Sequence, residues 1–453
     1  MVAQSVDVVV IGMGPGGEDV ASKLAEAGLA VVGVDQRLLG GECPYFGCVP
    51  SKMMIRAANA LEEGRRIPAL AGSSSVTADF APVAKRIREE ATDNWDDIVA
   101  VRRFEGKGGR FVRGHGVITA PRTVTVGDTE YLARKAIVLN TGTEPAVPPI
   151  PGLADTPYWT NRDAVAVEEL PASLAVLGGG AIGCELAQVF ARFGVTVSVI
   201  EAAPRLLPVE EPESSELITE VFTAEGITVH AGAAATAVSH DASGFTLTLD
   251  GGAQVRAEKL LVASGRRNNL KGIGLPVIGL DENARFVEPD DRLRIADGVW
   301  AIGDITGKGA FTHMSMYQAA IATRDILGQD GPPARYHAVP RVTFTDPEVG
   351  AVGLTEAQAR EQGIAVRVGN AKIPESSRGW IHKAGNAGFL KLVADEDRGV
   401  LIGATSAGPT GGEVLGALAL AVHAAVPVAK FKEMIFAYPT FHRAIETALA
   451  DML

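Results

Sequence analysis

Two cysteines five positions apart, Cys43 and Cys48, are the residues of this chain best suited to redox chemistry. On a regular helix, residues five apart have Cα atoms roughly 8–9 Å from one another, whereas a disulfide needs about 7 Å or less. A bond between these thiols would therefore require the backbone to depart from regular helix, which Pro44 and Gly47 permit. A strained disulfide is easier to reduce, which suits catalysis. The alternative reading of the spacing is two unpaired thiols in a buried helix.

The segment before these cysteines has the pattern of a dinucleotide-binding unit. An apolar run at Val6–Ile11 predicts a buried parallel strand, a Gly-rich turn and a helical pattern follow, and a second apolar run ends in Asp35. Glycines let the backbone approach a pyrophosphate at a helix N-terminus, and Asp35 can accept hydrogen bonds from a ribose. The glycines concerned are Gly12, Gly14 and Gly17.

The same pattern recurs later in the chain. Ser173–Leu177 is predicted to be a strand, and the strand after the next helix ends in Glu201. Two such units imply two nucleotides, and the simplest pair is a bound flavin dinucleotide and an exchanging nicotinamide dinucleotide. The glycines of the second turn are Gly178, Gly180 and Gly183.

Composition limits the classes of function. A length of 453 residues allows two to four domains, and 47% hydrophobic residues fit a soluble α/β enzyme. The formal charge of -12 argues against nucleic acid or an anionic membrane surface as a partner. Three cysteines fit a reducing compartment. The first residues show no signal peptide, and the apolar stretch 414–429 is too short and polar for a membrane span, so we expect a cytoplasmic protein.

Further motifs follow in order along almost the whole chain. After GMGPGG and GGECPYFGCVPSK come NTGTEP (140–145), GGGAIGCELA (178–187), ASGRRNN (263–269), AIGD (301–304), VPRVTFTDPEVGAVGLTE (339–356) and AYPTF (437–441). With these motifs the chain resembles the FAD-dependent pyridine nucleotide–disulfide oxidoreductases. The resemblance implies an α/β fold with two Rossmann-like dinucleotide-binding domains, for FAD and NAD(P), plus a C-terminal α+β dimerisation domain.

The resemblance also implies domain boundaries. The FAD-binding domain would cover residues 1–150 and 266–335, the NAD(P)-binding domain 151–265, and the dimerisation domain 336–453. Pro-rich segments at 146–152 and 328–335 agree with these boundaries. Within the last domain, Leu390–Ala394 and Val400–Ala404 are predicted to form a β-hairpin.

Catalytic roles follow from the resemblance. Reduced nicotinamide would pass hydride to the flavin, which would reduce a Cys43–Cys48 disulfide. Cys48 would be the flavin-proximal thiol, Cys43 the thiol that attacks substrate, and a lowered thiolate pKa is expected there. Lys52 would lie near the flavin ring, paired with Glu185. The alternative is a surface lysine and an unrelated glutamate inside a helix.

Flavin contacts are implied in the same way. Asp304 would bind the ribityl chain, and Thr312 and His313, at the start of a helix reaching Ile326, would present backbone amides. Cys184 has no apparent partner and is expected to be an inert buried thiol. The other implied cofactor contacts are Gly41, Gly116, Thr141, Gly142, Arg266 and Gly303.

The nicotinamide dinucleotide is expected to be NAD rather than NADP. Glu201 stands where a ribose 2′-hydroxyl would be bound, and its charge would repel a 2′-phosphate. Arg205 is the only basic residue close behind it.

The C-terminal motif departs from the family pattern. Tyr438 replaces the histidine and Arg443 the glutamate that handle protons in the partner subunit's active site. A phenol is a poor base at neutral pH, although it can donate a hydrogen bond. His442 and Glu446, four apart, could form a shifted acid–base dyad or equally a surface pair. Family members that reduce mercury also carry tyrosine at this position, but they need a C-terminal cysteine pair. This sequence ends in Ala-Asp-Met-Leu, so mercury reduction is not expected.

The sequence therefore predicts an FAD-dependent NAD(P)H:disulfide oxidoreductase. It would act as a homodimer, with the partner's C-terminal segment completing each active site, on a small-molecule or protein disulfide. The alternative is an NAD(P)H-dependent reductase of quinones or similar acceptors, since the His–Glu pattern is altered. Nothing in the sequence supports a third reading, a flavoprotein whose main role is docking.

Overall fold

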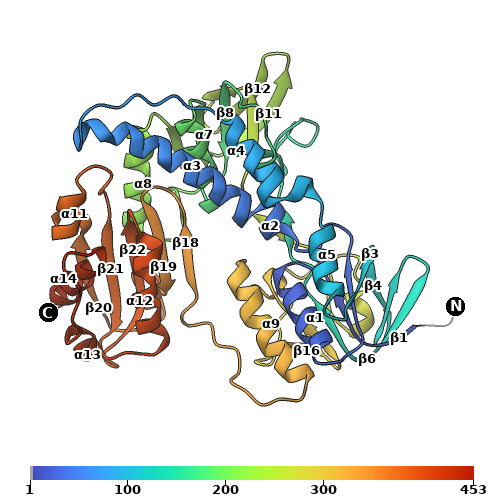
Figure 1. Cartoon of the computed structure of the whole chain (residues 1–453). Coiled ribbons are helices and arrows are strands. Elements are labelled where there is room, and N and C mark those ends of the chain that lie inside the picture. Colours follow the sequence, from blue (N-terminus) through green and yellow to red (C-terminus); the bar gives the residue numbers. More distant parts are fainter. Residues whose placement is uncertain (1–3, 453) are drawn as a thin grey trace. The chain divides into compact units, whose positions relative to one another are not determined.

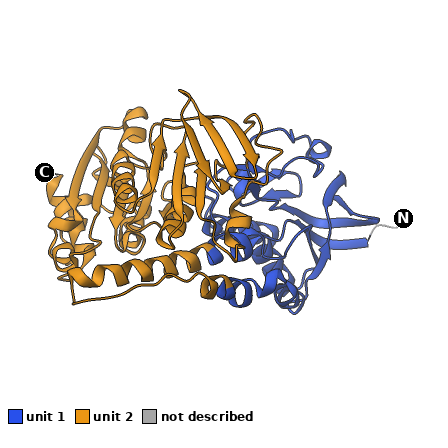
Figure 2. Cartoon of the chain, turned by 90° about the horizontal axis from the view of Figure 1, so that it is seen from above, with its two compact units in different colours: residues 1–50, 85–145, 266–336 blue, residues 51–84, 146–265, 337–453 orange. Residues whose placement is uncertain are grey.

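The structure is a computed structural model that describes residues 4–452 (Figure 1). The chain forms two compact units (Figure 2). Unit 1 comprises Met1–Pro50, Lys85–Pro145 and Arg266–Tyr336, and unit 2 comprises Ser51–Ala84, Ala146–Gly265 and His337–Leu453.

These units can be compared with the expected domains. Three boundaries of unit 1, after residues 145, 265 and 336, lie within a few residues of the expected FAD-domain boundaries at residues 150, 266 and 335. Residues 51–84, expected in the FAD domain, instead group with unit 2, because helix α3 (Cys48–Arg66) makes ion pairs with residues of that unit. Separate NAD(P)-binding and dimerisation domains within unit 2 stay a prediction.

Unit 1 is built on a sheet with the order β16-β17-β6-β1-β2-β3. β1 (Gln4–Ile11) pairs in parallel with β2 (Val31–Asp35) and with β6 (Thr129–Leu139). α1 (Pro15–Glu26) packs beside α9 (Thr312–Ile326), as Figure 1 shows. A further helix of this unit is α5 (Ile98–Glu105). Its remaining strands are β3 (Arg110–Arg113), β4 (Gly116–Ala120), β5 (Thr123–Val126), β7 (Thr143–Pro145), β15 (Arg266–Asn268), β16 (Arg294–Ala296) and β17 (Val299–Ala301).

The apolar runs of the sequence are the core of unit 1. Val8, Val9 and Val10 of β1 are fully buried, since α1 and other elements cover the sheet. Parallel order places the carboxyl ends of β1, β2 and β6 at one edge, where the turns that follow these strands meet.

Unit 2 contains two main sheets and a small antiparallel one. The parallel sheet, in the order β10-β9-β8-β14, includes β8 (Ser173–Leu177), the strand predicted from sequence, and α7 (Ala181–Arg192) follows it. The other elements of this half are α4 (Ala81–Arg86), α6 (Asn161–Val165), β9 (Thr196–Glu201), α8 (Pro212–Ala224), β10 (Thr228–Ala231), β11 (Ala235–Asp241), β12 (Gly244–Leu249), β13 (Gln254–Ala257) and β14 (Lys259–Val262).

The five-stranded antiparallel sheet has the order β18-β19-β22-β21-β20. β21 (Phe389–Asp395) and β22 (Val400–Gly408) form the predicted hairpin. The rest of this half consists of β18 (Pro340–Thr343), β19 (Glu348–Gly353), α10 (Glu356–Glu361), β20 (Val366–Lys372), α11 (Ser377–His382), α12 (Gly411–His423), α13 (Val428–Lys432) and α14 (Ala444–Asp451).

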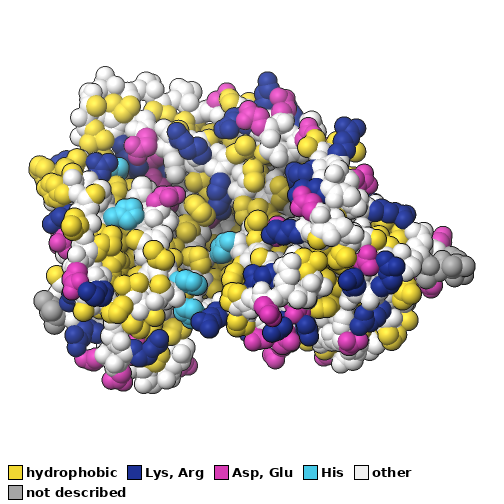
Figure 3. Space-filling view, turned by 60° about the horizontal axis from the view of Figure 1, so that its bottom comes forward, with side chains coloured by type: hydrophobic (Ala, Val, Ile, Leu, Met, Phe, Trp, Pro, Cys, Tyr) yellow, Lys and Arg dark blue, Asp and Glu magenta, His cyan; other side chains and the backbone are white. Residues whose placement is uncertain are grey.

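Two general properties of the surface bear on function. No helix within residues 4–452 is long and apolar enough to cross a membrane. On the face in Figure 3, basic and acidic side chains are interspersed, with no broad basic field of the kind that binds nucleic acid.

Candidate active site

The turn between β1 and α1 is shaped for a pyrophosphate. Gly12 has φ +93°, and a Cβ there would overlap the Asn140 carbonyl. A Cβ on Gly17 would overlap the Gly12 carbonyl. A Cβ on Gly14 would instead meet only the Asn140 side chain, at 3.4 Å. The first and third glycines thus allow close packing, and the second leaves space for a phosphate at the start of α1.

The turn between β8 and α7 repeats this design. Gly178 has φ +115°, and a Cβ there would meet the Ala263 carbonyl oxygen at 2.5 Å. A Cβ on Gly183 would overlap the Gly178 carbonyl, whereas nothing lies within 4 Å of a Cβ on Gly180. The second turn therefore has the same open position as the first.

Both expected ribose-binding acids are tied to their own Gly-rich turn. The Met13 N–H donates to Asp35 Oδ2 at 2.8 Å, and the Gly179 N–H donates to Glu201 Oε2 at 2.6 Å. Burial raises the pKa of Asp35 above its ordinary value. Each carboxylate is thus fixed at the end of the second strand, where a ribose would lie.

The cysteine segment bends between the two thiols. α2 (Glu42–Phe46) ends before Gly47, whose φ of −128° and ψ of −115° are not helical, and α3 begins at Cys48. The expected departure from regular helix between Cys43 and Cys48 is therefore present. Both residues are thiols in the structure, Cys43 half-buried and Cys48 exposed.

This cysteine segment packs directly on the first nucleotide turn. The Gly40 N–H donates to the Met13 carbonyl at 2.8 Å. A Cβ on Gly41, which has φ +67°, would lie 2.8 Å from the Gly14 Cα. Only glycine allows this approach, which brings the thiols to the edge of the sheet where a dinucleotide would bind.

Thr312, the first residue of α9, contacts the thiols. Cys48 Sγ lies 3.6 Å from Thr312 Oγ1. The pKa of Cys43 is raised, first by its hydrogen bond with Cys48 and then by burial, while the Thr312 hydroxyl opposes both effects. The expectation of a lowered pKa is thus wrong for Cys43, because its main neighbour is a second thiol rather than a cation.

Lys52 lies one turn after Cys48 in α3, and its expected partner is present. Lys52 Nζ donates to Glu185 Oε2 at 2.7 Å, and the Glu185 side chain is only 6% exposed. The other Glu185 oxygen accepts the Phe344 N–H at 2.8 Å. Lys52 Nζ also lies 4.6 Å from the centre of the Phe344 ring. The ammonium group is therefore held by an ion pair and an aromatic face.

Asp304 lies just after β17 and is held by a residue that the sequence did not single out. The Thr143 hydroxyl donates to Asp304 Oδ2 at 2.6 Å. Arg266 donates from Nε to Thr143 Oγ1 at 2.7 Å and from Nη2 to the Thr143 carbonyl at 2.8 Å. Arg266, expected to contact the cofactor, here orients Thr143. The NTGTEP motif contains Thr143, but its spacing gives no sign of this hydrogen bond.

Other expected contacts leave room for a bound group. Thr141 Oγ1 is buried and has no hydrogen-bond partner within the described chain. Gly142 has φ +63°, and nothing lies within 4 Å of a Cβ there. Gly116 is buried at the start of β4, Gly303 has φ +79°, and His313 follows Thr312 in α9. The unpaired Thr141 hydroxyl and the open space at Gly14 fit a flavin dinucleotide.

Of the two alternatives for His442 and Glu446, an acid–base dyad or a surface pair, the structure shows no direct pairing of the two side chains within residues 4–452. Glu446 Oε2 lies 3.0 Å from Arg443 Nη2, and the Arg443 guanidinium lies 5.3 Å from the centre of the Tyr438 ring. No hydrogen bond joins His442 to Glu446 in the residues that the structure covers. Instead, Arg443, three positions before Glu446, forms an ion pair with the Glu446 carboxylate.

Cys184 is an unreactive thiol, as expected. Its Sγ donates to the Gly179 carbonyl at 3.3 Å, and the side chain is fully buried. Burial, the largest influence, raises its pKa, so the thiol stays protonated.

These features define a flavoprotein that binds two dinucleotides and carries a redox-active dithiol. The chain belongs to the pyridine nucleotide-disulphide oxidoreductase family, which matches residues 6–323. Residues 339–449 match the dimerisation domain of the same family.

Relatives of known function agree with this assignment. The chain is 34% identical over 464 residues to the dihydrolipoyl dehydrogenase of Chlorobaculum tepidum, covering 100% of this chain and 98% of that protein. It is 33% identical to a mercuric reductase of Shigella flexneri, with 97% of this chain and 80% of that protein covered.

Solved structures give the same result. The Cu(II) complex of the HOCl-induced flavoprotein disulfide reductase RclA from Escherichia coli has a TM-score of 0.85 at 27% identity, covering 99% of both chains. LpdA from Mycobacterium tuberculosis has a TM-score of 0.86 at 26% identity, covering 99% of this chain and 100% of that one. The predicted α/β fold is thus confirmed, and the chain is an FAD-dependent NAD(P)H:disulfide oxidoreductase. These relatives do not favour the quinone alternative.

Proposed function

We propose that this chain passes electrons from NADH to the Cys43–Cys48 pair and from there to a small-molecule or protein disulfide. The observation that carries the proposal is the helix break at Gly47, which sets two thiols against the first nucleotide turn. FAD would be held by the β1–α1 turn, Asp35, Thr141 and Asp304. When bound, the flavin accepts hydride from the nicotinamide and supplies the two electrons that reduce the disulfide.

Thiol exchange then reduces the substrate. The Cys43 thiolate attacks one substrate sulfur, forms a mixed disulfide and displaces the other sulfur as a thiolate. The Cys48 thiolate attacks Cys43 Sγ, restores the enzyme disulfide and releases the second thiolate. Because the pKa of Cys43 is raised, this attack needs a group that removes its proton.

In the proposed homodimer, a residue of the partner subunit's C-terminal segment removes the proton of Cys43. The matched dimerisation domain leaves large apolar side chains exposed, with Trp380 at 75%, Ile435 at 94% and Tyr438 at 67%. Their burial against a second copy would stabilise a dimer.

His442 is the proposed proton-transfer group, because Glu446 is occupied by Arg443 and Tyr438 is a weak base. We expect His442→Ala to slow disulfide turnover about tenfold or more, within the range for general acid–base catalysis. Glu446→Gln is the matched control and should change the rate much less. An unchanged rate in His442→Ala, measured by NADH oxidation with a saturating disulfide, would exclude this role.

NADH is the proposed nicotinamide. Both terminal nitrogens of the Arg205 guanidinium are engaged: Nη1 donates to Ser215 Oγ at 2.6 Å, and Nη2 to the carbonyls of Pro208 and Glu210 at 2.9 and 2.8 Å. It is therefore not free to bind a 2′-phosphate, which would also meet the Glu201 carboxylate.

We expect kcat/KM to be at least about tenfold higher for NADH than for NADPH, since 1.4 kcal/mol of charge repulsion gives that factor. Glu201→Ser should lower the ratio of kcat/KM for NADH to kcat/KM for NADPH. Glu220→Ser, which removes an exposed glutamate of α8, should leave this ratio unchanged. A wild-type preference for NADPH would contradict the assignment.

The substrate class is tested by steady-state turnover. FAD-loaded protein is supplied with NADH and, in turn, lipoamide, glutathione disulfide, cystine and a quinone. Turnover with at least one disulfide is expected, and activity confined to the quinone would contradict the proposal.

A further inference from the structure

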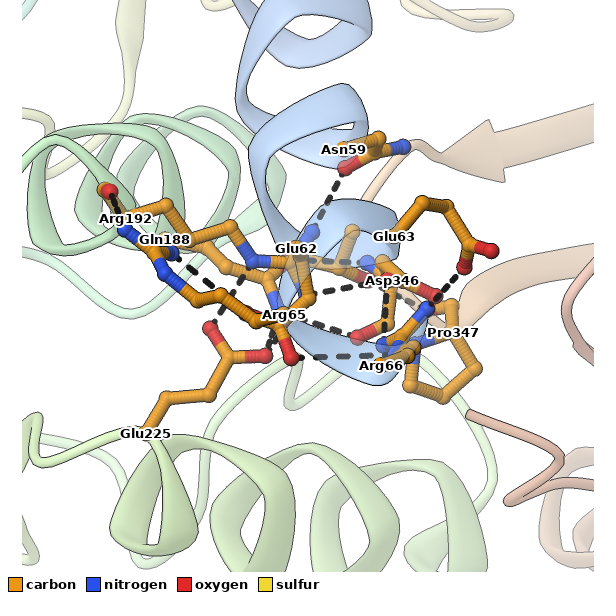
Figure 4. A network of polar contacts seen from close by, with 11 residues as sticks. Asn59, Glu62, Glu63, Arg65, Arg66, Gln188, Arg192, Glu225, Asp346 and Pro347 are labelled. Carbon is orange, nitrogen blue, oxygen red and sulfur yellow. Dashed lines mark hydrogen bonds and ion pairs between the residues drawn. The ribbon is translucent and has the colours of Figure 1, made fainter. Parts of the chain in front are cut away.

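A buried polar network links α3, α7 and the segment Phe344–Pro347 within unit 2 (Figure 4). Lys52, Asn59 and Arg66 follow one another at seven-residue intervals in α3 and so share one face of that helix. Glu185, Gln188 and Arg192 share one face of α7 in the same way.

α7 binds the backbone of the Phe344–Pro347 segment with two side chains. Glu185 accepts the Phe344 N–H at 2.8 Å. Gln188 accepts the Asp346 N–H at 2.8 Å and donates to the Asp346 carbonyl at 2.9 Å. Gln188 is buried, so these bonds are shielded from water and fix the segment on the helix.

The Asp346 carboxylate fastens the same segment to both helices. Its Oδ2 accepts from Arg192 at 2.9 Å and from Arg66 at 2.8 Å. The Arg192 side chain is 2% exposed and is also bound by Glu225 at 2.6 Å and Asn59 at 2.7 Å. The two arginines thus compensate the charges of Asp346 and Glu225, and Arg66 also forms ion pairs with Glu62 and Glu63 on its own helix.

One end of this network is Lys52. Of the two Glu185 oxygens, one holds Lys52 Nζ and the other holds the Phe344 N–H, while the Phe344 ring lies under the same ammonium group. A shift of Phe344 would therefore move both supports of Lys52 together.

We propose that Gln188 and Asp346 are positioning residues for Lys52, acting through the Phe344 backbone. The inference rests on the proposed function and on the expectation, from the family resemblance, that Lys52 lies near the flavin ring. A fixed positive charge there stabilises the electron-rich reduced flavin by Coulomb attraction. When the Phe344 backbone is no longer fixed, the Lys52 ammonium group can move away from the flavin ring. The midpoint potential of the flavin then falls.

The test measures this potential in FAD-loaded Gln188→Leu, Asp346→Asn and Lys52→Met variants. We expect all three to have a lower potential than the wild type, with the largest shift in Lys52→Met. Flavin reduction by NADH in Gln188→Leu should slow about tenfold, less than the 10²-fold that a full 1 Å misplacement can cause. The Lys52→Met/Gln188→Leu double variant should have the potential of Lys52→Met alone, because the two changes act through one group.

Lys391→Met is the control for general loss of stability, since Lys391 forms a separate buried ion-pair cluster in unit 2. It should lower the melting temperature and leave the potential unchanged. A lower melting temperature in Gln188→Leu with an unchanged potential, or additive shifts in the double variant, would overturn the inference. An unchanged potential in Lys52→Met would instead show that the proposed site of Lys52 is wrong.

Discussion

Cys43→Ser abolishes NADH-dependent disulfide reduction and leaves flavin binding intact. Serine cannot form the mixed disulfide with substrate, so we expect disulfide turnover to fall about a thousandfold or more, as when a catalytic nucleophile is removed. Cys43 is half-buried and serine has nearly the same size as cysteine, so the variant should keep the visible flavin spectrum. The measurement is steady-state NADH oxidation with the best disulfide substrate.

Cys184→Ser is the matched control for this experiment. Cys184 is fully buried in α7 and donates only to the Gly179 carbonyl, which a serine hydroxyl can also do. Its disulfide turnover should stay close to that of the wild type. Undiminished turnover in Cys43→Ser would show that electrons reach the substrate by another route, such as directly from the flavin.

Lys391→Met should strongly destabilise unit 2. The Lys391 ammonium lies 3.1 Å from Glu211, 2.7 Å from Glu213 and 3.0 Å from Glu356. Lys391 and Glu211 have side chains 6% and 3% exposed, so removal of the cation leaves a buried, uncompensated carboxylate. We expect a loss of about 3–5 kcal/mol in the free energy of unfolding, measured by denaturant titration.

The same cluster should make stability depend on pH. The hydrogen bond from Lys391, the largest influence, lowers the pKa of Glu356, so Glu356 stabilises the fold above its unfolded pKa. That contribution is lost as pH falls through the lower, folded pKa. In Lys391→Met the contribution of Glu356 to the acid dependence should become smaller, because only Arg360 then lowers the Glu356 pKa.

Lys372→Met is the control, because Lys372 and Glu375 are 75% and 72% exposed. It should change stability by less than about 1 kcal/mol. If Lys391→Met and Lys372→Met lowered the free energy of unfolding equally, the Lys391 cluster would be exposed to water in solution.

Periodic patterns predicted the elements that position the site. Strand β8 has the predicted bounds, and the break at Gly47 lies where a non-helical residue between the cysteines was expected. These features are local: an apolar run, a glycine or a helical spacing is determined by residues near one another in sequence.

Contacts between distant segments could not be read in this way. Thr143 holds Asp304 across 161 positions, and Gln188 holds Asp346 across 158. The DPE sequence around Asp346 belongs to one of the family motifs, yet no spacing links it to α7. Arg443 likewise displaces His442 as the partner of Glu446, although both spacings suit a helix. The pKa of Cys43 was expected to fall and instead rises, because the hydrogen bond with the Cys48 thiol and burial outweigh the effect of the Thr312 hydroxyl.

The account depends most on electron transfer from the flavin to Cys43 and Cys48. The direct measurement is anaerobic titration of FAD-loaded protein with NADH, followed by thiol labelling and peptide mapping. We predict that NADH makes both cysteines available to the label, and that neither is labelled in the oxidised protein. Protein that binds no flavin, or whose flavin is reduced by NADH while both cysteines stay unlabelled, would contradict the account.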